Sequence, residues 1–159
     1  MPTGQVFEKL SNLIKDLAGK YESSVFEPHV TLLGGIASNE KEIIQKTENL
    51  SQMILPYTIK LEEVSYSEHY FKALFVRVKN TFEVQEAYIK ALQIFPEEGP
   101  YMAHLSLTYG NFPPNIKQQM IIEVGDRFNE EFLVDRIHLY RTDSDKVEDW
   151  YKVQEFKLK

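Results

Sequence analysis

The 159-residue sequence contains no cysteine, and this absence removes several kinds of chemistry at once. A disulfide framework, a thiolate nucleophile and a cysteine-based zinc site are all excluded. No apolar run is long enough to span a bilayer, and residues 1–4 lack the basic start of a signal peptide. We therefore expect a cytoplasmic protein with no membrane partner.

Basic residues are scarce as well, because 18 Lys and Arg stand against 24 Asp and Glu and give a net charge of −6. A protein that binds a long phosphate backbone normally carries a basic stripe, since phosphate neutralisation dominates that affinity. The sequence shows no such stripe. A long nucleic acid is not expected as a partner, and a phosphate-bearing ligand would be a small molecule held by a few local donors.

Apolar and aromatic residues are plentiful, and they favour one compact domain. Apolar residues make up 43% of the chain and include ten Phe and nine Tyr. A chain of this length is an ordinary single domain or two small lobes that share a core. We predict one monomeric domain over residues 1–159, with lobes roughly at 1–79 and 80–159 and strands possibly exchanged between them.

The two halves of the sequence repeat the same order of elements. Apolar periodicity and capping signals predict helices, and alternation predicts strands. Each half has the order helix, strand, helix, strand, strand, with corresponding elements about 75 residues apart. Direct strand-to-strand connections favour antiparallel sheets, so the expected class is α+β with a bilobal, pseudo-twofold arrangement. The predicted helices cover 5–20, 39–53, 81–95 and 115–125, and the predicted strands cover 28–35, 57–65, 71–79, 101–109, 131–141 and 149–158.

One predicted strand of each half carries a histidine followed two residues later by a hydroxyl residue. His29 and Thr31 occupy the same places as His104 and Ser106. Because side chains alternate along a strand, each pair lies on one face with aliphatic residues on the other. If the halves pack about a pseudo-twofold axis, both polar faces meet in one cleft.

The other two histidines, His69 and His138, provide an internal control, because neither is followed two residues later by Ser or Thr. His69 is expected in a hairpin turn, where the aromatic residues nearby pack against a sheet. His138 is expected on a strand, facing solvent or partly buried. A structural role would be the usual interpretation of one such histidine, but the matched pair at 29 and 104 favours chemistry.

Two histidines beside two hydroxyls suit phosphoryl transfer by general acid–base catalysis. One imidazole takes a proton from water while the other donates a proton to the leaving alcohol. Ordinary histidine pKa values of about 6.5 allow both roles near neutral pH without a metal or other cofactor. The hydroxyls can donate hydrogen bonds to the phosphate oxygens.

These residues also carry a family resemblance. Two segments resemble the paired signatures of the 2H phosphoesterase superfamily, and within it the cyclic phosphodiesterases of plant and yeast type: Phe26-Glu-Pro-His29-Val-Thr31-Leu and Tyr101-Met-Ala-His104-Leu-Ser106-Leu-Thr-Tyr109-Gly. The resemblance implies a bilobal antiparallel fold with a central cleft. It also implies that His29 and His104 are catalytic, that Thr31 and Ser106 bind phosphate, and that Tyr109 lies against the substrate.

The resemblance further implies the substrates. Family members open ADP-ribose 1″,2″-cyclic phosphate to ADP-ribose 1″-phosphate, and nucleoside 2′,3′-cyclic phosphates to nucleoside 2′-phosphates. We expect His104 to be the base and His29 the acid, although the pseudosymmetry leaves the reverse assignment open. Two alternatives remain: an RNA-end 2′,3′-cyclic phosphodiesterase or 2′-5′ RNA ligase-like enzyme, and a non-catalytic nucleotide-binding module.

One feature departs from the family pattern, since family members usually begin with a strand that carries an aromatic residue. This sequence begins almost at the predicted helix 5–20. The internal repeat indicates the same difference, because helix 81–95 follows strand 71–79 whereas helix 5–20 follows none. Either that strand lies outside this chain or another segment fills its place.

Overall fold

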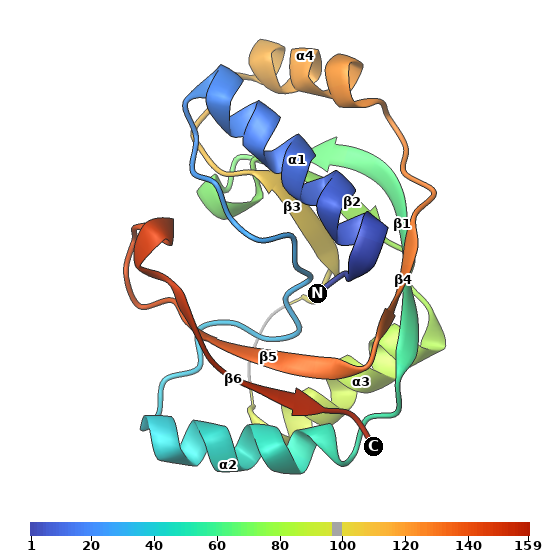
Figure 1. Ribbon diagram of the computed structural model, residues 1–159, viewed down its shortest axis with the longest axis vertical. Helices are drawn as coiled ribbons and strands as arrows, with labels where there is room; N and C mark the ends of the chain where they lie inside the picture. Colours follow the sequence, from blue (N-terminus) through green and yellow to red (C-terminus); the bar gives the residue numbers. More distant parts are fainter. Residues whose placement is uncertain (97–99) are drawn as a thin grey trace.

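The computed structural model describes residues 1–96 and 100–159 of the chain, and it is an α+β structure built from antiparallel sheets (Figure 1). Two short 3-10 helices accompany the regular elements, η1 (Tyr70–Lys72) and η2 (Val147–Asp149). The helices are α1 (Gly4–Tyr21), α2 (Glu40–Ser51), α3 (Phe82–Ile94) and α4 (Pro114–Val124), and the strands are β1 (Tyr57–Tyr66), β2 (Leu74–Val78), β3 (His104–Thr108), β4 (Glu131–Val134), β5 (Arg136–Arg141) and β6 (Tyr151–Lys157).

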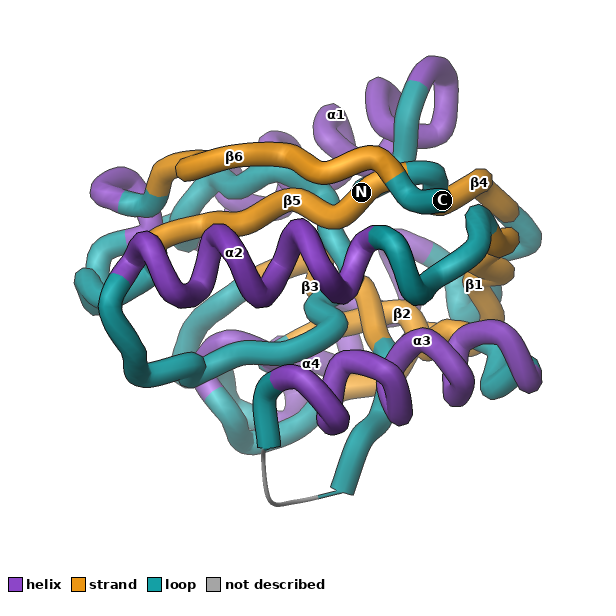
Figure 2. Tube along the Cα trace, turned by 90° about the horizontal axis from the view of Figure 1, so that it is seen from below, coloured by secondary structure: helices purple, strands orange, loops and turns teal. Residues whose placement is uncertain are grey.

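The long strand β1 organises the larger sheet, whose strand order is β3-β2-β1-β4. Residues 57–60 of β1 pair with β4, and residues 61–66 pair with β2. Strands β5 and β6 form a separate two-stranded sheet. Helix α1 packs on β3, whereas α2 contacts β5, β6 and α3, so that elements of the two sequence halves interleave in space (Figures 1 and 2).

Local signals in the sequence explain where the helices begin. Asn39 accepts a hydrogen bond from the Glu42 amide at 2.9 Å and caps α2. Thr81 caps α3 in the same way, through the Val84 amide. Each cap satisfies one amide that the first helical turn leaves without a partner. The predicted helix starts at these two positions are confirmed.

The strand predicted at 28–35 is wrong, because this segment makes only an isolated antiparallel bridge between Val30 and Leu105. Pro28 has no amide hydrogen to donate to a ladder. Gly35 has a φ of +71°, a left-handed conformation that ends extended pairing. The segment therefore lies along the edge of β3 without becoming a regular strand.

The single strand predicted at 131–141 is also wrong, because it forms two strands that belong to different sheets. The chain leaves the large sheet after β4 and enters the small sheet with β5, and Asp135 lies between them. The apolar alternation changes phase at this point, from Phe132 and Val134 to Ile137 and Leu139. That phase change is the sequence signal for the switch.

The prediction of a strand at 71–79 holds only for its second part, since η1 precedes β2.

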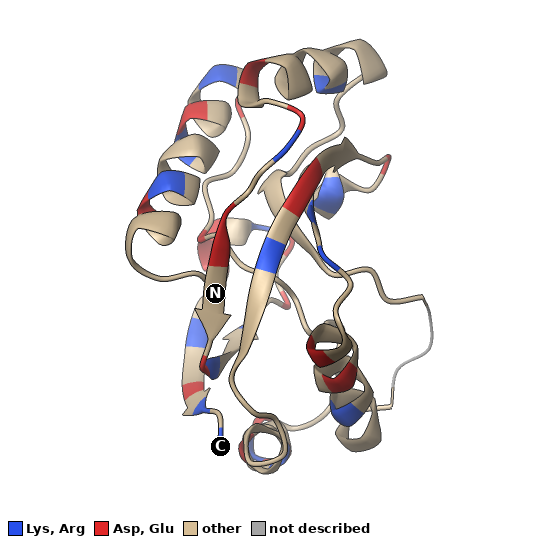
Figure 3. Cartoon of the chain, turned by 90° about the vertical axis from the view of Figure 1, so that its right-hand side faces the viewer, with Lys and Arg blue, Asp and Glu red and all other residues tan. Residues whose placement is uncertain are grey.

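Strand β5 pairs along one edge with β6, and no strand of the described residues pairs with its other edge. No helix in the described ranges is long and apolar enough to cross a membrane. Figure 3 shows acidic and basic residues interspersed along the helices and strands.

Candidate active site

Both histidine motifs line one cavity of about 1190 Å³. The structure brings together the five residues that the sequence singles out, since all of them contribute to the lining: His29, Thr31, His104, Ser106 and Tyr109. The cavity exceeds the roughly 300–1,000 Å³ of common small-molecule sites. It also reaches β5, whose residues form the wall opposite the large sheet.

The two histidines have the same local geometry although their backbones differ. His104 begins the regular strand β3, whereas His29 lies on the irregular segment beside it. The Nδ1 atom of His29 is 2.7 Å from the carbonyl oxygen of Glu27, and that of His104 is 2.9 Å from the carbonyl oxygen of Met102. In both cases the acceptor is the carbonyl two residues earlier in the chain.

These hydrogen bonds fix the tautomer of each ring. A carbonyl oxygen only accepts, so each Nδ1 must carry the hydrogen that it donates. The proton that an imidazole gains or loses is then the one on Nε2. Each Nε2 is therefore available to take up or release a proton at a ligand.

Burial lowers the pKa of both rings below the ordinary value of 6.5. For His29, the hydrogen bond to the Glu27 carbonyl and the Glu27 carboxylate raise the pKa in part, and the amino group of Met1 lowers it further. For His104, the Met102 carbonyl raises the pKa, and the charges of Lys72 and His29 lower it. A charge on His29 therefore disfavours a charge on His104.

The two hydroxyls differ in their surroundings. Ser106 is only 5% exposed, and its Oγ donates to the Phe71 carbonyl at 3.0 Å. Thr31 is exposed to solvent. A phosphate between the motifs would thus meet a free hydroxyl at Thr31, while the Ser106 hydroxyl would have to exchange its present acceptor.

Aromatic side chains gather beside the first motif. Tyr109 is 3% exposed and stacks on Phe26, with ring centroids 3.9 Å apart. Phe71 contacts both Tyr109 and Trp150, and it lines the cavity with 44% of its surface exposed. The expectation that the aromatic residues near His69 pack against the sheet is therefore wrong for Phe71, because η1 turns this side chain toward the cavity.

Sequence reasoning missed the wall that β5 contributes. His138 is half-buried on β5, as expected, but it lines the same cavity as the motif histidines. Arg136 and Tyr140 line the cavity too, two residues to either side on the same strand. The alternation along β5 gave no signal for this wall, because Ile137 and Leu139 line the cavity as well.

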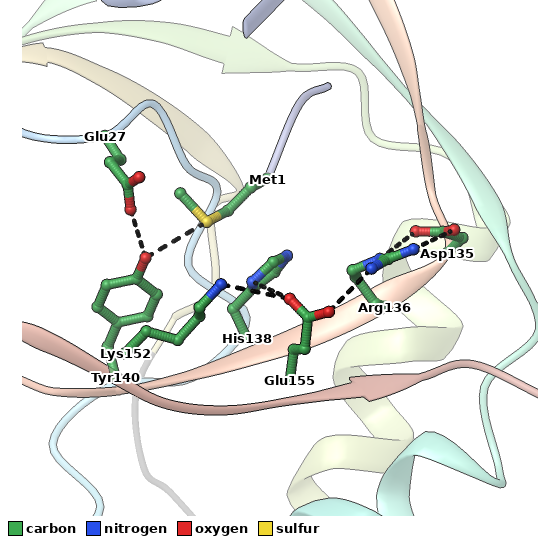
Figure 4. Close-up of polar contacts among 8 residues, drawn as sticks. All are labelled: Met1, Glu27, Asp135, Arg136, His138, Tyr140, Lys152 and Glu155. Carbon is green, nitrogen blue, oxygen red and sulfur yellow. Dashed lines mark hydrogen bonds and ion pairs between the residues drawn. The ribbon is translucent and has the colours of Figure 1, made fainter. Parts of the chain in front are cut away.

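A hydrogen bond connects this wall to the first motif. The Tyr140 hydroxyl donates to the side-chain carboxylate of Glu27 (Figure 4). The backbone carbonyl oxygen of Glu27 accepts the hydrogen bond from His29. On the same wall, Arg136 pairs with Asp135 and Glu155. Among the described residues there is no group of three or more carboxylate or imidazole side chains placed to hold a metal ion.

The comparisons with known proteins agree with this architecture. A family model described as the 2′-5′ RNA ligase superfamily matches residues 6–146. The chain is similar to a protein of Arabidopsis thaliana named cyclic phosphodiesterase, with 25% identity over 161 residues that cover 96% of this chain and 89% of the relative. The fold of this chain is similar to that in the crystal structure of TT0787 of Thermus thermophilus, with a TM-score of 0.65 and 14% identity. The match covers 95% of this chain and 92% of TT0787. The chain belongs to the 2′-5′ RNA ligase superfamily, the group of 2H phosphoesterases whose paired histidine signatures its sequence resembles.

Proposed function

We propose that this protein hydrolyses small cyclic phosphates by metal-independent acid–base catalysis with His29 and His104. One observation carries the proposal: two imidazoles in one cavity have the same tautomer, fixed by the same backbone hydrogen bond. Two Nε2 atoms that can exchange protons at one ligand are what an in-line displacement at phosphorus requires. Membership of a phosphoesterase superfamily and the name of the Arabidopsis relative support the reaction class.

In the proposed reaction, one neutral imidazole removes a proton from a water molecule that attacks phosphorus. The ring P–O bond on the opposite side breaks, and the protonated imidazole gives its proton to the departing alkoxide oxygen. One proton is taken up and one is released, so the pair ends with the same total charge. Hydroxyls at Thr31 and Ser106 donate to the non-bridging oxygens, which gain charge in the transition state.

We assign the base to His104 and the acid to His29. Burial lowers the pKa of His29 most, and the Met1 amino group lowers this pKa more than the Glu27 carboxylate raises it. The side-chain charges that act on His104, those of Lys72 and His29, both disfavour its protonated form. Burial and the surrounding charges lower the pKa of both rings and do not separate the two roles, so the reverse assignment is the alternative to test.

The proposed substrates are ADP-ribose 1″,2″-cyclic phosphate and nucleoside 2′,3′-cyclic phosphates, opened to the 1″-phosphate and the 2′-phosphate. The exposed face of Phe71 at the cavity offers a surface on which a base can stack. Of the alternatives, an enzyme acting on long RNA ends would need a basic rim that the acidic chain does not favour. A non-catalytic binding module would not need all four motif residues.

The test is hydrolysis of these two substrate types in EDTA by the wild type, His29→Ala and His104→Ala. We expect turnover by the wild type and a loss of about 10²–10⁴-fold in each variant, the usual contribution of a positioned acid or base. His69→Ala is the matched control, because this exposed histidine lies outside the cavity lining. Unchanged turnover in either motif variant would overturn the mechanism, and activity lost in EDTA but restored by a metal would overturn metal independence.

A further inference from the structure

We infer that Lys72 and Arg77 form a second anion site beside His104, which binds a phosphate of the substrate that lies outside the reacting ring. The inference rests on the proposed function for its substrate class. It concerns two basic residues that the sequence motifs do not include and that the proposed acid–base step does not use.

Strand register places Arg77 next to the second motif. Arg77 pairs with His104 across the antiparallel ladder of β2 and β3, and Phe75 pairs with Ser106. Directly opposed residues of an antiparallel pair project from the same face of the sheet. Arg77 and Phe75 therefore lie on the face that carries the motif side chains.

A buried aromatic ring holds the two cations close to the catalytic histidine. The Nζ atom of Lys72 is 5.7 Å from the centroid of the Phe75 ring, and the Cζ atom of Arg77 is 6.0 Å from it. The Phe75 ring is itself 5.4 Å from the His104 ring, and the residue is only 2% exposed. Because Phe75 is buried and cannot move freely, its ring is a fixed neighbour of both cations. Lys72 also lies close enough to lower the pKa of His104.

Lys72 and Arg77 lie beside His104 outside the cavity lining, and their charge distinguishes them from the wall that β5 contributes to the cavity. On that wall Arg136 pairs with Asp135 and Glu155, and Arg141 pairs with Asp143 and Glu40. Carboxylates within the protein thus already neutralise the cations of β5.

Lys72 and Arg77 form no ion pair with any carboxylate of the described residues. Arg77 instead directs one guanidinium nitrogen to the sulfur of Met102 at 3.3 Å, a weak acceptor that an anion would readily replace. Within residues 1–96 and 100–159, no carboxylate therefore neutralises these two cations.

The guanidinium of Arg77 and the ammonium group of Lys72 indicate which ligand the site binds. A guanidinium fork and an ammonium group together match phosphate oxygens, the fork by geometry and the ammonium by charge. The site is too small and too local to follow a polynucleotide, so we assign it to one further phosphate on the same small molecule. The diphosphate of ADP-ribose and the 5′-phosphate of a nucleotide share this chemistry.

The test measures binding of a matched pair of product analogues, which keeps it independent of turnover. Adenosine 2′-phosphate and adenosine 2′,5′-bisphosphate differ only in the added 5′-phosphate. By titration calorimetry we expect the added phosphate to tighten Kd roughly tenfold in the wild type, the effect of one charge-assisted hydrogen bond at the low end of its range. Arg77→Gln should abolish this advantage, and Lys72→Gln should reduce it.

Lys90→Gln is the matched control, because it removes the same charge from α3, where Lys90 pairs with Glu86. It should keep the full advantage of the bisphosphate. No advantage in the wild type, an advantage that survives Arg77→Gln, or an equal loss for both ligands would overturn the inference. Hydrolysis could fail while this binding pattern holds, so the two proposals stand or fall separately. Binding of two further ligands, ADP-ribose 1″-phosphate and a trinucleotide with a 2′-phosphate, identifies the source of the additional phosphate. The ligand whose affinity falls more in Arg77→Gln is the one whose additional phosphate occupies the site.

Discussion

The two histidine motifs are equivalent in sequence but are supported in different ways. His104 belongs to β3, a strand whose residues Leu105 and Leu107 are fully buried. His29 lies on a segment that makes one bridge to β3, at Val30, and is otherwise held by side chains. The comparison teaches that the hydrogen bond from each Nδ1 to the carbonyl oxygen two residues earlier does not require a regular strand.

The largest expected difference between the two regions is in stability. Leu107→Ala should lower the free energy of unfolding by about 2–5 kcal/mol, as large-to-small changes in a packed core do. Leu32, its counterpart in the first motif, is only half-buried on the irregular segment, so Leu32→Ala should cost clearly less. Urea unfolding of the two variants measures both. Equal losses would show that the first motif is as much a part of the core as β3.

The next effect concerns the hydrogen bond between Tyr140 and Glu27, which joins β5 to the first motif and has no counterpart at the second among the described residues. Tyr140→Phe should lower kcat/KM about tenfold. This corresponds to the low end of the roughly 1.5–3 kcal/mol that a hydrogen bond to a charged group contributes. Loosening this segment should also hydrate His29 and raise its pKa toward the ordinary value, while the pKa of His104 stays unchanged. Histidine NMR titration of the variant measures the pKa values of His29 and His104.

Tyr151→Phe is the control for this experiment, because Tyr151 lies exposed on β6 and is not part of the cavity lining. Glu27→Gln keeps an acceptor for the tyrosine hydroxyl and should retain most of the activity, unlike Glu27→Ala. Equal pKa shifts at both histidines would contradict the asymmetry, because they would indicate a general loosening of the fold.

Much of the fold was readable from the sequence because its signals are local. The caps at Asn39 and Thr81 and the repeated spacing of His29 and His104 need only neighbouring residues, and each led to a correct placement. The change of sheet at Asp135 was also present, as a shift in apolar alternation. The strand predicted at 28–35 failed because strand formation needs a partner on the adjacent edge, which a single segment does not reveal.

The residues around the motifs could not be predicted for the same reason. Arg77 lies beside His104 only through the register of β2 and β3, and Tyr140 reaches Glu27 from 113 residues away in the chain. Both contacts depend on how separate strands are aligned. The pattern of hydroxyls after the histidines predicted residues that line one cavity, whereas the charged and phenolic groups near them required the assembled structure.

The smallest expected effect is a shift of the pH profile, which follows if both imidazoles form one acid–base pair with lowered pKa values. In the free enzyme, kcat/KM should be largest below pH 6.5. Above that maximum kcat/KM should fall as the pH rises, because the acid loses its proton. Binding of the anionic substrate favours protonated imidazoles, so the kcat profile should shift toward higher pH. Initial rates across the pH range measure both profiles, and a kcat/KM maximum well above pH 6.5 would contradict the lowered pKa values.

Nitrogen-detected NMR titration of the four histidine rings tests the acid–base pair most directly, since it reports the tautomer and the pKa of each ring. We predict that His29 and His104 are both protonated at Nδ1 in their neutral forms and that both titrate below the ordinary value of 6.5. A neutral ring at either motif with its hydrogen on Nε2, or a pKa of either ring at or above 6.5, would contradict the pairing.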